Sequence, residues 1–214
     1  MLHAPKKSWF LALLLVGFSL MLVTNRLTEV SRALEPVQPP AAIAKQRECS
    51  PSQILTAQAC AGDGIEPEEQ RLYELITQYR DRNGLPRISL APSLNLVANR
   101  HVQDLGKNIG TLTHGWSNCP YNAGDRASYP CMWEAPQRLG TPYPGFGYEN
   151  AYWSSARATA NSALQSWQGS SAHNAVILNQ GIWQDNDWQA LGIGIYGSYA
   201  VLWFGEEVDP AAER

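Results

Sequence analysis

Three side chains in the sequence are of types that suit metal binding or acid–base chemistry: His114 in TLTHGW, Glu149 in GYENAYW and His173 in SSAHNA. Glu149 and His173 stand among apolar and aromatic neighbours, where a charged group must be paired, hydrogen-bonded or metal-bound, or lose its charge. Two imidazoles and one carboxylate form a ligand set for zinc or another transition metal. All three residues lie just beyond or between the elements that the sequence predicts, where functional side chains are often held. No H-x-x-x-H or similar motif fixes their geometry, so three independently hydrogen-bonded polar residues are the alternative interpretation.

Three segments predict amphipathic helices, because apolar residues recur in them every three to four positions. The segments are EPEEQRLYELITQYRDRNG, APSLNLVANRHVQDLGKNIG and ARATANSALQSWQ. Their apolar faces consist of Leu72, Leu75, Ile76 and Tyr79 in the first, Leu94, Val97, Ala98, His101 and Leu105 in the second, and Ala160, Ala163, Leu164 and Trp167 in the third. His101 therefore points where core residues point, and we assign it to the core rather than to a site.

The segment ALGIGIYGSYAVLWFGEEV has a different period. Leucine and isoleucine alternate with glycine over 191–195, Gly197-Ser198 forms a tight turn, and an apolar stretch follows, which together predict an antiparallel hairpin. Helices followed by strands predict an α+β fold in which helices pack on an antiparallel sheet. Residues 116–148 show no period and are rich in Gly, Pro, Trp and Tyr, and a loop of this length inside a domain is usually functional or pinned down.

Four cysteines form two closely spaced pairs, Cys49 with Cys60 and Cys119 with Cys131. Their even number suits an oxidising compartment, and the C-x10-C and C-x11-C spacings suit local disulfides rather than the C-x2-C knuckles of structural zinc sites. Four cysteines allow three connectivities, of which we predict the nearest-neighbour one; four free buried thiols are the alternative. A bridge from Cys119 to Cys131 would pin the loop over 116–148.

The N-terminus predicts export. Lys6 and Lys7 precede an apolar run from Trp9 to Val23, whose length fits either a cleaved signal peptide or an uncleaved transmembrane anchor. The lysines favour an N-terminus that stays inside and a translocated remainder, so we expect an extracytoplasmic protein that is secreted or membrane-anchored. The chain divides into a signal peptide or anchor over 1–33, a proline-rich tether with a candidate disulfide knob over 34–64, a folded domain over 65–208 and a tail over 209–214.

The charge distribution bears on the partner. Residues 34–214 carry 12 basic and 18 acidic residues, a net charge of −6, and contain no run of Lys or Arg. This balance argues against a polyanion-binding surface, so we do not expect a nucleic-acid partner.

Several motifs follow one another in a characteristic order. A helix ending in Y-R-x-x-x-G-L-P precedes SLAPSLNLVANRHVQDL, then T-H, G-Y-E-N, W-x-x-S-x-x-H-x-x-x-I-L-N and G-I-G-I-Y. Over about Glu68 to Glu206 this order resembles the CAP superfamily of cysteine-rich secretory proteins, venom antigens and plant pathogenesis-related proteins, and W-x-x-S-x-x-H is similar to its bacterial branch. The resemblance implies that 65–208 is a CAP domain, a three-layer α-β-α sandwich with a central, mainly antiparallel sheet and a broad cleft.

The resemblance also implies a site. The family's cleft is lined by two histidines and two glutamates, and the histidine pair binds zinc or another divalent cation in some members. By motif, the metal ligands correspond to His114 and His173 and the first glutamate to Glu149, which would hold one imidazole while Asn150 packs beside it.

Two departures from the family pattern concern this site. Tyr148 replaces the usual glycine before the Glu-Asn pair. The second glutamate is missing, because the chain reads Trp167-Gln168-Gly169-Ser170 where it is expected. Ser170 would hold a neighbouring water or imidazole, and a four-residue acid–base site is not assumed.

We therefore expect a binding or interaction protein rather than an enzyme, with a protein, lipid or cell-wall ligand and a divalent cation in the cleft. A metal-dependent hydrolase of peptide or phosphodiester bonds is the alternative, and Glu149 would be its catalytic base. A third interpretation is carbohydrate or cell-wall binding by the aromatic residues of the long loop, unless these rings fill the loop's own core. The residues are Trp116, Tyr121, Tyr129, Trp133, Tyr143 and Phe146.

Overall fold

The computed structural model describes residues 48–212 of the chain. The predicted signal peptide or anchor over 1–33 and the part of the tether before Glu48 lie outside the described residues. Within 48–212, no helix has both the length and the apolar character that crossing a membrane requires.

The described residues contain a four-stranded mixed sheet in the order β1-β3-β4-β2. Its strands are β1 (Ser89–Leu90), β2 (Tyr148–Trp153), β3 (Ala190–Tyr196) and β4 (Tyr199–Gly205). β1 runs parallel to β3, whereas the β3–β4 and β4–β2 pairs are antiparallel. The predicted hairpin is confirmed, since β3 and β4 pair across the turn at Gly197-Ser198.

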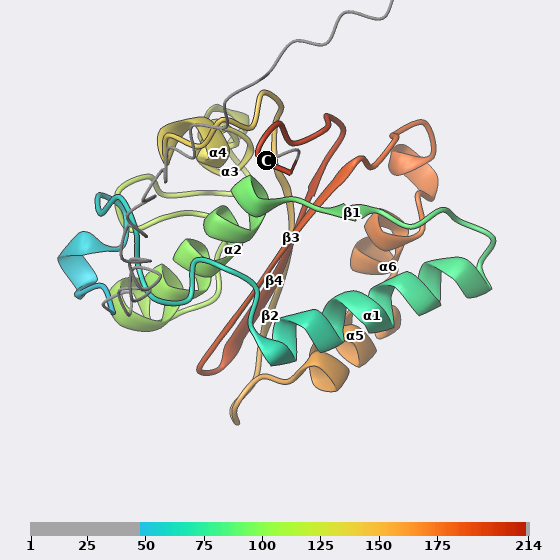
Figure 1. Cartoon of the computed structure of the whole chain (residues 1–214), viewed down its shortest axis with the longest axis horizontal. Helices are drawn as coiled ribbons and strands as arrows, with labels where there is room; N and C mark the ends of the chain where they lie inside the picture. The colour runs from blue at the N-terminus through green and yellow to red at the C-terminus, as the bar shows by residue number, and fades with distance from the viewer. Residues whose placement is uncertain (1–47, 213–214) are drawn as a thin grey trace, which may run out of the picture. The chain divides into compact units, whose positions relative to one another are not determined.

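Helices cover both faces of the sheet (Figure 1). α2 (Pro92–Asp104) lies on one face, and α1 (Pro67–Arg82), α5 (Ala160–Gly169) and α6 (Ser171–Ile177) lie on the other. This arrangement confirms the α+β class and the three-layer α-β-α sandwich. The shorter elements are η1 (Pro51–Gln53), η2 (Leu105–Ile109), η3 (Arg126–Ser128), α3 (Pro130–Trp133), α4 (Ala135–Arg138) and η4 (Gly181–Trp183).

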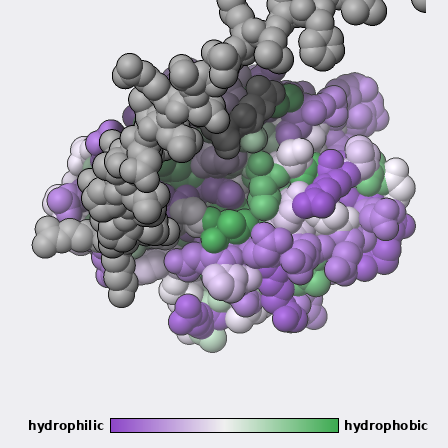
Figure 2. Space-filling model, in the orientation of Figure 1, coloured by the Kyte–Doolittle hydropathy of each residue, from purple (hydrophilic) through white to green (hydrophobic). Residues whose placement is uncertain are grey.

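The sequence of α1 contains the usual residues that start and end a helix. Pro67 opens its first turn, two acidic residues follow, and Gly84 lies just past its end with a φ of +71°. Leu72 and Ile76 on its inner face are buried, whereas its outer face is hydrophilic (Figure 2). The three predicted helices are all present, and they place their predicted apolar faces toward the sheet.

The sheet separates two apolar cores, because successive side chains of a strand point to opposite faces. The even-numbered apolar residues of β4 join the core beneath α1 and α5, and the odd-numbered ones join the core beneath α2. The two sets are Ala200, Leu202 and Phe204, and Tyr199, Val201 and Trp203. Both faces of β4 are therefore apolar, as a strand between two helix layers requires.

β3 carries glycine at two positions that face α2. A methyl group placed on Gly192 would lie 2.1 Å from the carbonyl oxygen of Leu94, and one placed on Gly194 would lie 2.5 Å from main-chain atoms of Ala98. The alternation of glycine and isoleucine thus supplies apolar side chains to one core and lets the α2 main chain touch the sheet on the other face. This contact sets the height of α2 above the sheet.

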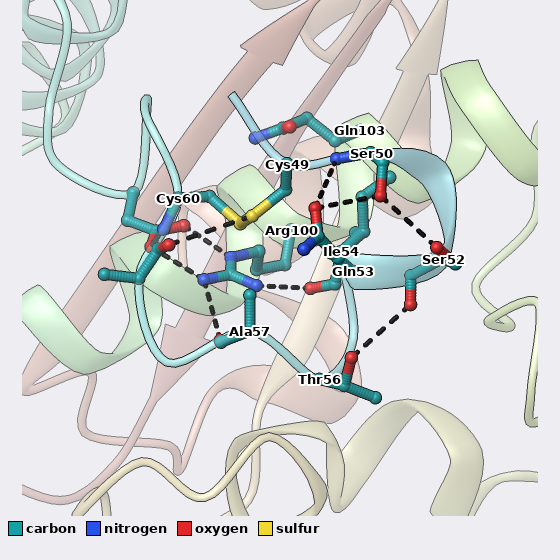
Figure 3. Close-up of a disulfide and its surroundings, with 12 residues drawn as sticks. Cys49, Ser50, Ser52, Gln53, Ile54, Thr56, Ala57, Cys60, Arg100 and Gln103 are labelled. Carbon is teal, nitrogen blue, oxygen red and sulfur yellow. Dashed lines mark hydrogen bonds and ion pairs between the residues drawn. A yellow bond between two sulfur atoms is a disulfide. The ribbon is translucent and has the colours of Figure 1, made fainter. Parts of the chain in front are cut away.

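A small disulfide-closed segment, the knob (residues 49–60), packs against the side of α2 away from the sheet. Arg100 of α2 is 2% exposed and points into the knob (Figure 3). Its Nη1 donates to the carbonyl oxygen of Ile54 at 2.5 Å, and its Nη2 donates to that of Ala57 at 3.2 Å. Its Nε and Nη2 also donate to the two carboxylate oxygens of Asp63 at 2.5 and 2.8 Å. One buried cation therefore joins the knob to α2.

Helix side chains cover part of one edge of the sheet. β1 pairs with only two residues of β3, and beyond them the main chain of β3 bonds to side chains. The amide N of Ile193 donates to Asn95 Oδ1 at 2.9 Å, and its carbonyl oxygen accepts from Asn99 Nδ2 at 3.2 Å. The amide N of Ile195 donates to Glu69 Oε1 at 2.9 Å. Polar residues buried in α1 and α2 thus replace a partner strand.

The carboxyl group of Glu69 at this edge makes stability depend on pH. Burial raises its pKa from 4.5 to about 7, against the lowering effect of hydrogen bonds from the main chain of Glu66 and Ile195. Because the folded-state pKa is higher than the unfolded-state pKa, the stability that Glu69 contributes is complete below pH 4.5 and is lost as pH rises through about 7.

We expect Glu69→Gln, which cannot ionise, to remove this part of the pH dependence of stability. Urea unfolding between about pH 4.5 and about pH 7.5 measures it, with the exposed Glu74→Gln as control. A free-energy difference between wild type and Glu69→Gln that stays constant over this range would contradict the prediction.

The segment between α2 and β2 contains more regular structure than the predicted loop over 116–148. A disulfide joins Cys119 and Cys131, as predicted, and η3, α3 and α4 lie within or after the loop that it closes. Each of these helices has four residues or fewer, which is too short for an apolar period to show in the sequence.

Candidate functional site

Glu149 and Asn150 lie in β2, which pairs with β4 on one side and forms the edge of the sheet on the other. The prediction that Glu149 lies between elements is wrong. The sequence of β2 lacks the alternation of apolar and polar residues that predicts a strand, because its buried residues, Glu149 to Ala151, are consecutive and two of them are polar. Neighbouring residues of a strand point to opposite faces, so Glu149 points toward α2 and Asn150 toward α6.

On the α2 face, Glu149 holds two imidazoles. Its Oε1 lies 2.5 Å from Nδ1 of His101, and its Oε2 lies 2.7 Å from Nδ1 of His114. The residue is only 7% exposed. Burial alone would raise the pKa of Glu149, but the charge and hydrogen bond of His101, together with those of His114, lower it to about 2. A buried carboxylate is therefore held in its charged form by two imidazole rings. The sequence interpretation predicted that Glu149 would hold one imidazole only.

The two histidines of the cleft have opposite pKa shifts. Burial lowers the pKa of His114, but the hydrogen bond and charge of Glu149 outweigh it and the net pKa lies above 6.5. Burial and the charge of His114 lower the pKa of His173 below 6.5, against a smaller raising effect of Glu149. His173 is thus neutral at pH values where His114 begins to take up a proton.

On the other face of β2, His173 lies within α6 rather than between elements, which corrects its predicted position. Its Nδ1 lies 2.9 Å from Ser170 Oγ, so Ser170 holds an imidazole, one of the two roles expected for it. Asn150 Nδ2 donates to the main-chain oxygen of His173 at 2.9 Å. Asn150 therefore ties the edge strand to α6 and does not pack beside Glu149.

A cleft with a volume of about 380 Å³ lies between these two groups, and His114, Glu149, Asn150 and His173 all line it. Its walls are mainly apolar and aromatic. They include Tyr121, Met132, Tyr148, Val176, Ile182 and Trp183, of which Ile182 is 88% exposed. A second pocket of about 400 Å³ lies between the knob and α2, but Arg100 is the one ionisable side chain in its lining and is already engaged, so the candidate site is the cleft.

The aromatic residues of the segment before β2 have different environments. Trp116 and Tyr143 are buried. Tyr121, Tyr129 and Trp133 contact one another in series, with ring centroids 5.2 and 5.3 Å apart, whereas Phe146 is 50% exposed. Most of these rings therefore pack against each other, and Tyr121 is the member of this set that lines the cleft.

The sequence matches the family model described as "CAP: Cysteine-rich secretory protein family" over residues 73–199. The chain belongs to the cysteine-rich secretory protein (CAP) family. A comparison of the CAP chain with curated proteins finds no match.

Three bacterial proteins of known structure are similar to this CAP chain, and each match covers 67% of it. An extracellular protein containing an SCP domain from Bacillus anthracis str. Ames has 20% identity, a TM-score of 0.51 and 45% of its own length covered. A cysteine-rich secretory protein from Staphylococcus aureus subsp. aureus Mu50 has 16% identity, a TM-score of 0.47 and 40% covered. An outer surface protein from Borrelia burgdorferi has 20% identity, a TM-score of 0.46 and 96% covered. The chain therefore spans less than half the length of the first two.

His101 lies behind the cleft, in contact with Glu149, and is the polar partner that the sequence interpretation missed. It is fully buried, as predicted for a core residue, but both of its ring nitrogens are engaged by polar groups. The signal was an ionisable side chain on an otherwise apolar helix face. The sequence did not indicate that Glu149 is its hydrogen-bond partner, because the strand that brings Glu149 next to α2 was not predicted.

The CAP cleft contains two imidazoles whose nitrogens are of a type that binds transition metals. Nδ1 of His114 is engaged by Glu149 and Nδ1 of His173 by Ser170, which leaves Nε2 of each ring as a ligand atom. Among residues 48–212, no group of three or more His, Cys, Asp or Glu is placed to hold a metal ion. Two imidazoles completed by water are therefore the ligands that these residues offer, and they do not form a closed structural zinc site.

Proposed function

We propose that this CAP domain is an extracytoplasmic binding protein whose cleft holds a divalent cation weakly between His114 and His173. The observation that carries the proposal is the hydrogen bonding of the cleft imidazoles. Glu149 and Ser170 each engage Nδ1 of one ring, and both rings line the same cleft. A carboxylate that holds the far nitrogen of a metal-binding histidine raises the basicity of the ligand nitrogen.

The engagement of Glu149 favours binding over hydrolysis. A metal-dependent hydrolase needs a base within reach of the metal-bound water. Both carboxylate oxygens of Glu149 are occupied by imidazoles, and the second family glutamate is replaced by the Gln168-Gly169-Ser170 stretch. Among residues 48–212, those that line the cleft thus offer ligand nitrogens and apolar walls but no carboxylate free to take a proton.

Several features support a location outside the cytoplasm, with the protein secreted or anchored by its N-terminal segment. The leader pattern and the two disulfides both suit an oxidising compartment. The Bacillus anthracis structure is itself described as that of an extracellular protein. The apolar cleft walls fit a protein, lipid or cell-wall ligand that inserts an apolar group.

Zinc titration of the purified protein by calorimetry tests the proposed site. We expect wild type to bind zinc weakly and His173→Ala to lose measurable binding, because one of two protein ligands is gone. Glu149→Gln should weaken binding by about 10–100-fold, as loss of a partner behind a metal ligand does. Binding should decline as pH falls through the raised pKa of His114, which lies above 6.5, because the proton competes with the ion.

Gln165→Ala, at an exposed position of α5, is the control and should bind zinc as wild type does. Wild type that shows no pH-dependent binding, or His173→Ala that binds equally well, would refute the cation site. Turnover of a peptide or phosphodiester substrate by the zinc-loaded protein would refute the binding-only function.

A further inference from the structure

His101 lies deep between α2 and the sheet, enclosed by two tryptophans. Its side chain is fully buried. Its ring packs on that of Trp116 with centroids 4.4 Å apart and a tilt of 33°, and it meets Trp203 edge-on at 5.9 Å.

Both nitrogens of the His101 ring face acceptors. Nε2 lies 2.9 Å from the carbonyl oxygen of Gly115, and a carbonyl oxygen only accepts, so Nε2 carries a proton. Nδ1 lies 2.5 Å from Oε1 of Glu149, whose other oxygen accepts from His114. A neutral imidazole has one N–H, and two are needed here. The second proton therefore lies in the hydrogen bond that joins Nδ1 to Oε1 of Glu149.

His101 also holds His114 along two routes. Its Nδ1 fixes Glu149 Oε1, which leaves Oε2 to accept from His114 Nδ1. Its Nε2 holds the carbonyl oxygen of Gly115, the residue that follows His114 in the chain. The side chain of His114 and the main chain next to it are thus both positioned from one buried ring.

We infer that His101 is a positioning residue of the cleft: through its two ring nitrogens it fixes Glu149 and Gly115 so that His114 donates through Nδ1 and presents Nε2 to the ligand. The consequence for cation affinity rests on the proposed function. The tautomer of His114 does not, because it is a property of the metal-free protein.

Two measurements on wild type and His101→Phe, which keeps an aromatic ring but no nitrogen, test this inference. Long-range 1H–15N NMR of the metal-free proteins at about pH 8, where an ordinary imidazole is neutral, reports which ring nitrogens carry protons. In wild type we expect His101 to be protonated at Nε2, which faces the carbonyl oxygen of Gly115, and His114 to be protonated at Nδ1. In His101→Phe we expect His114 to populate both tautomers and the zinc affinity to fall by about 10–100-fold.

Leu105→Ala is the matched control, since Leu105, the first residue of η2 directly after α2, is another fully buried side chain of the same core and takes no part in the hydrogen bonds of His101. It should leave the tautomer of His114 unchanged. A single tautomer of His114 in folded His101→Phe would overturn the inference. Should His101→Phe not fold, the wild-type spectrum decides: a proton on Nε2 of His114 in place of Nδ1 overturns the inference, and a single Nδ1-protonated form of His114 supports it. Absence of zinc binding by wild type would refute the cation site alone, and the tautomer of His114 would still decide the role of His101.

Discussion

Arg100→Met is expected to lower the free energy of unfolding by about 3–5 kcal/mol, the range measured when one partner of a buried ion pair is removed. The substitution keeps an apolar stem of similar length but leaves the Asp63 carboxylate, which has 11% of its side chain exposed, without its cation. It also leaves the carbonyl oxygens of Ile54 and Ala57 without their donor. Urea unfolding followed by tryptophan fluorescence measures the loss.

Arg71→Met is the control for Arg100→Met, because Arg71 lies exposed on α1 and should change stability by no more than about 0.5 kcal/mol. The double variant Arg100→Met with Asp63→Asn should recover part of the loss, since the uncompensated charge is removed. Equal stabilities of Arg100→Met and Arg71→Met would show that the knob is not held through this cation.

Gly192→Ala should be similarly damaging. Its methyl group would lie 2.1 Å from a main-chain oxygen of α2, and main-chain atoms of a packed helix cannot turn aside as a flexible side chain can. Either α2 must lift from the sheet or β3 must bend. Overpacked cores typically lose about 1–3 kcal/mol, and we expect the free energy of unfolding to fall by about 3 kcal/mol or more. Lifting α2 would also carry His101 away from Glu149, so zinc affinity should fall together with stability.

Gly64→Ala serves as the control for Gly192→Ala. Apart from its two chain neighbours, no described residue has an atom within 4 Å of the position that its methyl group would take, and its φ lies outside the range that favours glycine. It should be neutral or slightly stabilising, because alanine restricts the unfolded chain. Gly192→Ala with wild-type stability would mean that α2 does not pack on the sheet as closely as the structure shows.

Much of the fold could be predicted from the sequence, because its long elements have clear periods. The helix faces led by Leu72, Leu94 and Ala160 and the hairpin around Gly197 all recur in the structure. β2 could not be found in this way. Its polar pair, Glu149 and Asn150, is buried through specific partners on opposite faces, and such pairing is invisible to hydrophobic patterns.

The candidate site could likewise be predicted only in part. Resemblance to the CAP family pointed to His114, Glu149 and His173, and the structure brings all three to one cleft. The role of His101 depends on the distance between α2 and β2 in space, which glycines in a third element, β3, determine. Residue types along one helix carry no information about such a distance.

The edge of β3 that is covered by helix side chains bears on how molecules of this protein meet at high concentration. A strand with open amide and carbonyl groups invites a strand from a neighbouring molecule, and this is a common start of fibrils and swapped dimers. Asn95, Asn99 and Glu69 already occupy the groups at Ile193 and Ile195, so an incoming strand would first have to displace buried hydrogen bonds. Side chains that hold the helices in place thus also protect the folded protein from polymerising along this edge.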